Sequence, residues 1–144
     1  NHFRVGEALF FGLDLFTQET IEGMQADVLK LYAEVIEIIE KPKIPIGELD
    51  ANPSGEVFEI NEEDYGKTSY RAILDIGLLD ISPEFLIPVK PNTEISGASS
   101  DMLILDMGDS PHYKVGDLVE FNLKYMGALG LMNSNYIEKR ILNT

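Results

Sequence analysis

The residues best suited to chemistry lie near the start of the chain, where Arg4 and Gly6 precede a short apolar stretch at residues 8–11. If that stretch is a helix, its first backbone N–H groups lack helical partners and its dipole favours negative charge beside them. Gly6 would let an anion such as phosphate approach the backbone closely. The pattern indicates an anion site, and a plain glycine turn is the alternative. Because the chain opens on Asn1 without a methionine, we expect it to be the later part of a longer protein.

The composition is that of a globular protein with an acidic surface. Of 144 residues, 44% are hydrophobic and 25% are charged, and the net charge is −14. This length suffices for one domain with its own core. Binding to nucleic acid or to anionic membranes is disfavoured, because both require clustered Lys and Arg. The acidity suits either a well-solvated surface or the attraction of cationic ligands.

Cysteine and histidine limit the possible chemistry further. The chain has no cysteine, and its histidines, His2 and His112, are far apart in the sequence. We therefore expect no disulfide, no thiolate metal site and no zinc site. The chain has no run of roughly 18 apolar residues that could span a membrane. Residues 1–16 also lack the basic region followed by an apolar region that is typical of a signal peptide. These features predict a cytoplasmic protein.

The framework that would position these residues is predicted to consist mostly of strands. The longest candidate covers residues 26–41, where the apolar positions fit both helical and strand periodicity. Its many β-branched residues favour one long strand, which Pro42 ends. Residues 125–132 are expected to form a short helical or irregular piece.

The other expected strands are short and are separated by turns containing Pro, Gly or Asn. They cover residues 57–60, 70–76, 85–89, 102–107, 118–123 and 136–142. Pro88 argues that its strand lies at a sheet edge, and residues 52–55 and 113–117 are expected to be turns. This pattern predicts a mainly β domain, with a boundary near residue 20.

Several short motifs, taken in order along the chain, resemble those of the alanine racemase family. They are residues 4–9 (RVGEAL), 70–77 (YRAILDIG), 97–102 (GASSDM), 115–119 (VGDLV) and 135–138 (NYIE). The details are more similar to the ornithine racemase-like branch. The motifs shared with that branch are residues 4–8 (RVGEA), 45–48 (PIGE), 97–101 (GASSD) and 134–139 (SNYIEK). The resemblance covers nearly the whole chain.

This resemblance implies a fold and a cofactor. The family joins a (β/α)8 barrel of fold type III, which holds pyridoxal phosphate (PLP), to a C-terminal β domain. Residues 1–20 would be the last strand and helix of the barrel, and residues 21–144 would be the β domain. The lysine that binds PLP covalently would lie outside this chain, so the chain alone is expected to be inactive. The parent enzyme would be a head-to-tail homodimer with sites shared between subunits.

The resemblance also implies which residues bind the cofactor. Arg4 would face the pyridine nitrogen of PLP, while Gly6 and Glu7 would offer backbone N–H groups to its phosphate. Tyr136 falls where these enzymes have a phosphate-binding tyrosine, whose hydroxyl can donate a hydrogen bond. The plainer interpretations are a surface arginine at Arg4 and an ordinary strand aromatic at Tyr136.

On the substrate side, Ser99, Ser100 and Asp101 match the segment that reaches the substrate carboxylate, although they also fit a simple turn. One departure matters: where alanine racemases have a catalytic tyrosine, this chain has Leu78, which cannot transfer a proton. Asp80 and Asp101 are the nearest ionisable candidates for the second base. A carboxyl group works as a base near neutral pH when burial raises its pKa.

The sequence thus favours a PLP-dependent racemase that interconverts the enantiomers of ornithine or a related amino acid by removing the α-proton. PLP would act as the electron sink, and the acidic surface would suit a cationic substrate. Two alternatives remain open: a non-catalytic β-rich interaction module, and a PLP-binding regulatory relative in which Leu78 marks a lost base. An upstream barrel with a lysine at a strand end would distinguish the racemase from the interaction module.

Overall fold

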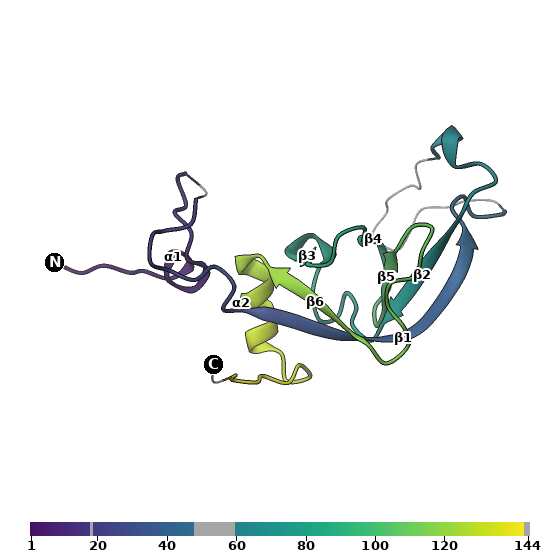
Figure 1. Cartoon of the computed structure of the whole chain (residues 1–144). Helices are drawn as coiled ribbons and strands as arrows, with labels where there is room; N and C mark the ends of the chain where they lie inside the picture. Colours follow the sequence, from purple (N-terminus) through teal and green to yellow (C-terminus); the bar gives the residue numbers. More distant parts are fainter. Residues whose placement is uncertain (18, 48–59, 143–144) are drawn as a thin grey trace.

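The structure, a computed structural model, describes residues 1–17, 19–47 and 60–142. In chain order the elements are α1 (Glu7–Phe11), β1 (Lys30–Pro42), the 3-10 turn η1 (Glu62–Asp64), β2 (Thr68–Leu74), the 3-10 turn η2 (Pro83–Phe85), β3 (Leu86–Pro88), β4 (Glu94–Ala98), β5 (Leu103–Asp106), β6 (Leu118–Leu123) and α2 (Tyr125–Asn133). Figure 1 shows β1 running along most of the molecule, with α1 and α2 near its start and β2, β4 and β5 near its end.

The strands form one six-stranded sheet in the order β3-β6-β1-β2-β5-β4, and every neighbouring pair is antiparallel. Strand β1 serves both halves of this sheet: residues 30–34 pair with β6, and residues 35–42 pair with β2. The register shifts between Val35 and Glu37, which marks a β-bulge where the pairing changes. A bulge bends its strand and increases the local twist, and β1 is visibly curved in Figure 1. The prediction of a mainly β chain is confirmed.

The alternation of side chains explains why β1 is a strand and not a helix. Leu31, Ala33 and Val35 are buried, whereas Tyr32 and Glu34 between them are exposed. A sheet with one buried face requires this period of two. The prediction of one long strand is confirmed, although the strand begins at Lys30 and not at residue 26.

The hydrophobic core lies on the inner face of the sheet and is closed by α2. Strands β1, β2, β3, β5 and β6 all contribute buried side chains, and the largest that is fully buried is Phe121. Helix α2 adds Leu131 and packs closely on η2, because a methyl group on Gly127 would lie 2.7 Å from Phe85 Cβ. The core therefore fixes the sheet and α2 relative to each other.

The predicted strands that became β2, β5 and β6 are confirmed within a few residues. The 85–89 prediction corresponds to β3, which lies at the edge of the sheet as Pro88 indicated. The helical alternative for residues 125–132 is confirmed as α2, and the short helix expected at residues 8–11 is α1. The expected turn at residues 52–55, most of the expected strand at 57–60 and Glu48 of the 45–48 motif lie outside the described residues.

Two expectations differ from the structure. The strand expected at residues 136–142 is wrong, because the described residues after α2 form neither helix nor strand. A strand needs a partner with which to pair, and residues 136–142 pair with neither edge strand of the sheet, β3 or β4, so that Tyr136, Ile141 and Leu142 stay exposed. Strand β4 was not predicted, since Ser96 and Gly97 give it little β-propensity. It is an edge strand held by pairing with β5, with a bulge between Ile95 and Gly97.

The proposed boundary near residue 20 stays a prediction. Residues 1–6 lie outside any helix or strand, and α1 is followed by an isolated antiparallel bridge between Leu13 and Thr20. The ring of Phe11 meets that of Tyr125 edge-on, with centroids 6.3 Å apart, so this segment contacts the start of α2.

Candidate functional site

The clearest candidate site is a pair of turns that the fold brings together. The first, at residues 77–80, follows β2. The backbone N–H groups of Asp80 and Ile81 both donate to the Gly77 carbonyl, over 2.9 and 3.0 Å. The Asp80 carboxylate accepts a hydrogen bond in return from the Gly77 N–H at 3.4 Å. Asp80 therefore helps to close its own turn.

The second turn, at residues 99–102, connects β4 to β5 and is closed by Ser99. The Ser99 N–H donates to the Met102 carbonyl over 2.8 Å, and the Met102 N–H donates to the Ser99 hydroxyl over 3.2 Å. The plain interpretation of Ser99 as a turn residue is thus consistent with its contacts. These bonds define the backbone path that carries Ser100 and Asp101.

Backbone hydrogen bonds hold the two turns against each other. The Leu78 N–H donates to the Ser99 carbonyl and the Leu79 N–H donates to the Ser100 carbonyl, each over 2.9 Å. These bonds join the segment that carries Leu78 and Asp80 to the segment that carries Ser99, Ser100 and Asp101. We refer to residues 77–80 and 99–102 together as the paired turns.

The paired turns present their side chains at the surface. Leu78 is 38% exposed and Met102 is 41% exposed, while Ser100 and Asp101 are also exposed and Asp80 is half-buried. Within the described chain the Asp101 carboxyl has no hydrogen bond or ion pair. The arrangement offers hydroxyl and carboxylate groups beside exposed apolar side chains.

The residues expected to bind a cofactor lie elsewhere in the chain, in the segment before β1 and in the segment after α2. Gly6 is the N-cap residue of α1 and has no side-chain capping bond, and its carbonyl accepts from the N–H groups of Leu9 and Phe10 over 3.0 and 3.1 Å. Arg4 is exposed and Glu7 is half-buried. Within the described residues, the backbone N–H groups of Gly6 and Glu7 therefore have no hydrogen-bond partner.

Tyr136 lies beyond α2 and is 93% exposed, and its N–H donates to the Ser134 hydroxyl over 3.2 Å. In the described part of the chain no hydrogen bond, ion pair or ring contact joins Tyr136 to Arg4, Gly6 or Glu7. The Phe11–Tyr125 contact brings α1 to α2, but it does not assemble these four residues into one site.

Sequence reasoning missed a polar cluster around His112. The His112 Nε2 lies 2.7 Å from the Thr93 hydroxyl, and the Lys90 ammonium donates to the His112 carbonyl over 2.6 Å. Lys90 also lies 4.4 Å from the centroid of the Tyr113 ring. Burial, followed by the nearby carboxylates of Glu120 and Asp117, raises the pKa of Tyr113. Because the partners are scattered over more than 20 positions of sequence, no local motif predicts this cluster.

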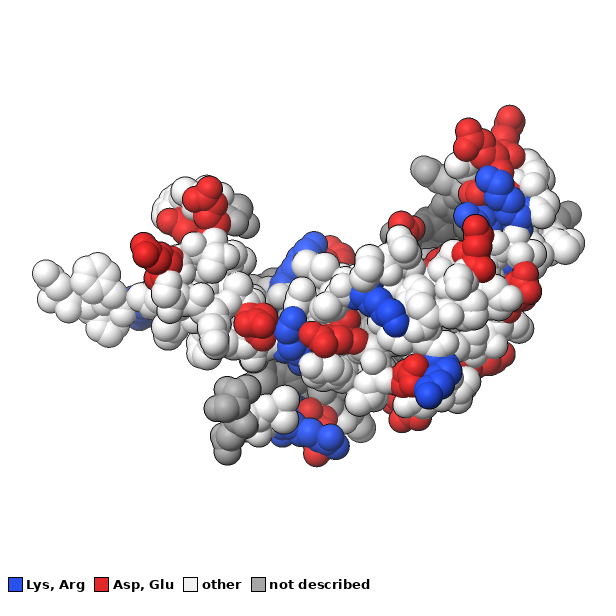
Figure 2. Space-filling model, viewed as in Figure 1, with Lys and Arg blue, Asp and Glu red and all other residues white. Residues whose placement is uncertain are grey.

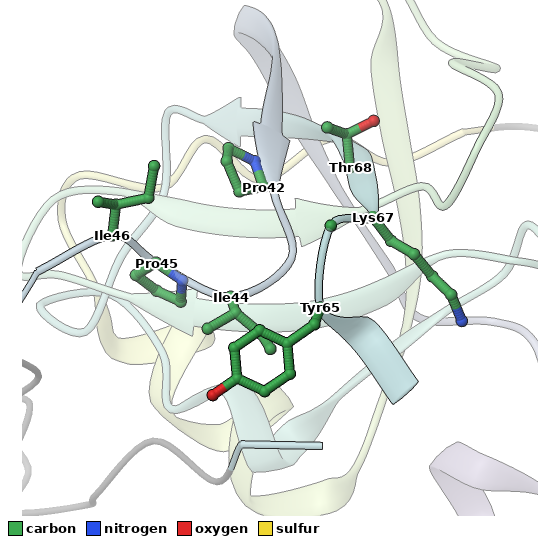
Figure 3. A pocket seen from close by; sticks show the side chains of 8 residues that line it. Pro42, Ile44, Pro45, Ile46, Tyr65, Lys67 and Thr68 are labelled. Carbon is green, nitrogen blue, oxygen red and sulfur yellow. The ribbon is translucent and has the colours of Figure 1, made fainter. Parts of the chain in front are cut away.

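An apolar pocket of about 310 Å³ lies at the far end of β1 (Figure 3). It is lined by Pro42, Ile44, Pro45, Ile46, Tyr65, Gly66, Lys67 and Thr68. Part of the 45–48 motif, which carries the resemblance to the ornithine racemase-like branch, therefore lines this pocket. Lys67 is the one ionisable cation among these residues and pairs with Asp64 at 3.9 Å, so we assign the pocket no chemistry.

Charged side chains of both signs are spread over the face of the molecule seen in Figure 2. Residues 1–17, 19–47 and 60–142 contain no group of three His, Cys, Asp or Glu side chains placed to hold a metal ion. In the same ranges, neither helix has the length and apolar character needed to cross a membrane.

Comparison with known proteins identifies the class to which the chain is related, the amino-acid racemases. No protein-family model matches the chain. It is 40% identical over 142 residues to ornithine racemase of Acetoanaerobium sticklandii, a match that covers 98% of this chain and 39% of that protein. It is 35% identical over 139 residues to lysine racemase of Thermotoga maritima, covering 96% of this chain and 38% of that protein.

The chain is therefore a homologue, over nearly its whole length, of part of ornithine racemase and part of lysine racemase. This confirms the resemblance to ornithine racemase-like proteins that the motifs indicated. The chain spans about two fifths of the length of these curated relatives. They do not favour the alternative of a non-catalytic interaction module.

Proposed function

We propose that this chain is the C-terminal portion of a PLP-dependent amino-acid racemase acting on ornithine or a related amino acid such as lysine. The observation that carries the proposal is the match of nearly the whole chain to an ornithine racemase and a lysine racemase. The proposed fold is the β domain of a fold-type III enzyme, with residues 1–20 belonging to the end of its barrel. The mainly β sheet of the chain supports this assignment.

The donor groups at the start of α1 fit a phosphorylated cofactor. Arg4 supplies an exposed guanidinium, and a methyl group on Gly6 would meet no atom within 4 Å, so an anion can approach this backbone freely. We propose that the N–H groups of Gly6 and Glu7, together with the Tyr136 hydroxyl, hold the phosphate of PLP, and that Arg4 faces its ring nitrogen. When bound, PLP supplies the electron sink that makes the α-proton of the substrate removable.

The paired turns are the proposed substrate side. Ser99 and Ser100 would orient the substrate carboxylate through hydroxyl and backbone groups, and Asp101 or Asp80 would move the α-proton in place of the tyrosine that Leu78 replaces. Asp101 has the freer carboxyl, because the Asp80 carboxylate is already engaged by the Gly77 N–H. We therefore favour Asp101 as the acid/base group.

We propose that the working enzyme is a homodimer in which a second subunit covers the paired turns. Their exposed Asp101, Leu78 and Met102 would then be buried, and burial would raise the pKa of a carboxyl group into the range useful for proton transfer. The net charge of −14 suits a diamino acid, whose side chain carries a positive charge. A cytoplasmic location stays a prediction from composition.

The test is chiral chromatography of L-ornithine, L-lysine and L-alanine after incubation with PLP and the protein from the complete reading frame that contains this chain. We expect D-ornithine or D-lysine to form, and no D-product from the 144-residue chain alone. If the complete, folded protein binds PLP but yields no D-enantiomer, a PLP-binding regulatory role is the better account. If it does not bind PLP, the proposal fails altogether.

A further inference from the structure

The contact between the paired turns is closest at Gly77. A methyl group at this buried position would lie 2.5 Å from both the Met102 nitrogen and the Ser100 carbonyl oxygen, and 2.6 Å from the Asp101 carbonyl carbon. All three are backbone atoms, so rotation of a side chain cannot relieve the overlap. Gly77 does not have a positive φ. Glycine is required here for space and not for an unusual backbone conformation.

The first turn, at residues 77–80, is held in place by hydrogen bonds to β1 and by hydrogen bonds within the turn itself. The Glu34 N–H donates to the Asp75 carboxylate over 2.8 Å, and the Asp75 N–H donates to the Glu34 carbonyl over 3.2 Å. These bonds fasten the segment before Gly77 to β1, the central strand. The bonds from Asp80 and Ile81 to the Gly77 carbonyl close the turn itself. A side chain at position 77 would therefore displace the 99–102 turn, which is the more exposed partner.

We infer that Gly77 is a positioning residue, and that the absence of a side chain there determines where Ser99, Ser100 and Asp101 lie. The functional meaning of this inference rests on the proposed function, because these three residues have a role in chemistry only if the protein is a racemase. The hydrogen bonds that the Leu78 and Leu79 N–H groups donate to the 99–102 turn indicate whether that turn lies in its native position. They form only while the two backbones remain in contact.

The inference can be tested on the 144-residue chain by amide hydrogen exchange measured by NMR. The variant is Gly77→Ala, and the matched control is Gly97→Ala in the neighbouring strand β4. An added methyl at position 97 would meet only Ile104 Cδ1, at an ordinary contact distance of 3.8 Å. We expect the Leu78 and Leu79 amides to exchange at least about tenfold faster in Gly77→Ala, and at the wild-type rate in Gly97→Ala. Wild-type exchange in Gly77→Ala would overturn the inference.

If Gly77→Ala does not fold, Asp80→Ala decides instead. This substitution removes the carboxylate that accepts from the Gly77 N–H and adds no atom at the contact. Faster exchange at Leu78 and Leu79 in the folded variant supports positioning by the 77–80 turn, and unchanged exchange contradicts it. Neither result depends on whether the protein racemises anything.

The activity measurement uses the protein from the complete reading frame. A 1 Å displacement of positioning groups can cost about 100-fold in rate, so we expect Gly77→Ala to lower kcat/KM for ornithine by roughly this factor, with a raised KM and unchanged PLP absorbance. Gly97→Ala should retain the wild-type constants. Unchanged KM and kcat in Gly77→Ala would overturn the functional part of the inference. If the wild-type protein is inactive, the proposed function fails and the exchange measurement alone decides the positioning.

Discussion

The paired turns and the terminal segments are held to the molecule in very different ways. Backbone hydrogen bonds and a close contact at Gly77 fix the paired turns to each other and to the sheet. The terminal segments, residues 1–17 and 134–142, expose most of their apolar side chains, among them Phe16 at 98% and Tyr136 at 93%. Their contacts with the rest of the molecule include the ring contact between Phe11 and Tyr125 and the packing of Ile137 on the core.

This difference separates the two halves of the proposed active site. Within this chain, the proposed substrate side already has a defined backbone geometry, whereas the proposed cofactor side has suitable donors that are not brought together. A preorganised site needs its groups held by their supporting structure. We therefore expect the substrate side to be sensitive to substitutions in this sheet, and the cofactor side to depend on surfaces that cover the terminal segments.

The largest expected effect follows from Asp101→Ala in the complete protein. If the paired turns carry the acid/base group, this change should reduce ornithine racemisation by about 100- to 10,000-fold, since a general acid or base contributes that much. Chiral chromatography of the reaction mixture measures the loss. Asp109→Ala, which alters an exposed acid in the turn after β5, is the control and should retain full activity. Wild-type turnover in Asp101→Ala would remove Asp101 from the mechanism.

The next effect concerns stability and contrasts the sheet with the N-terminal segment. Phe121→Ala empties a fully buried position in β6 and should lower the free energy of unfolding by about 3–5 kcal/mol. Phe16→Ala removes an almost fully exposed ring and should change that free energy by less than about 0.5 kcal/mol. Urea unfolding followed by circular dichroism gives both values. Equal losses would show that the N-terminal segment is packed as firmly as the sheet.

The smallest effect is a pH dependence. Burial and the nearby carboxylates of Glu120 and Asp117 raise the pKa of Tyr113 above its unfolded value of about 10. The unfolded chain therefore loses the phenolic proton first, so stability that is present below pH 10 is lost as the pH rises through the folded pKa. Urea midpoints measured from about pH 9 to 11 should fall more steeply in the wild type than in Tyr113→Phe. Equal slopes in the wild type and Tyr113→Phe would contradict this prediction.

Much of the sheet could be predicted because its strands carry their own signals. The β-branched and alternating residues of β1 indicated a long strand, and Pro88 indicated the edge position of β3. Strand β4 could not be predicted, because Ser96 and Gly97 give no strand signal and its conformation comes from pairing with β5. The false strand at residues 136–142 has the opposite cause. It has apolar residues suited to a strand, but these residues pair with no strand of the sheet, and Ile141 and Leu142 stay exposed.

The candidate site, like the sheet, could be predicted from the sequence only in part. The motifs in the sequence identified residues 97–101 and the segment that ends at Gly77, and the relatives agree with the family that those motifs indicated. The contact between the two turns could not be predicted, because it joins backbone atoms of residues more than 20 positions apart. A glycine that is required for space looks the same in a sequence as one in a loose turn. The roles of Arg4, Gly6, Glu7 and Tyr136 stay predictions.

The double pairing of β1 has a consequence for how the chain is made on the ribosome. The first half of β1 pairs with β6, and the Lys30 ammonium bonds the side chain of Asn122, 92 residues later. At a translation rate of about 5–20 residues per second, that half of β1 waits roughly 5–20 s for its partner strand to be synthesised. Throughout this interval the apolar side chains of Leu31 and Ala33 lie on a strand whose hydrogen-bonding edge is open. The nascent protein therefore passes through a period in which a chaperone that binds unpaired strands would protect it most.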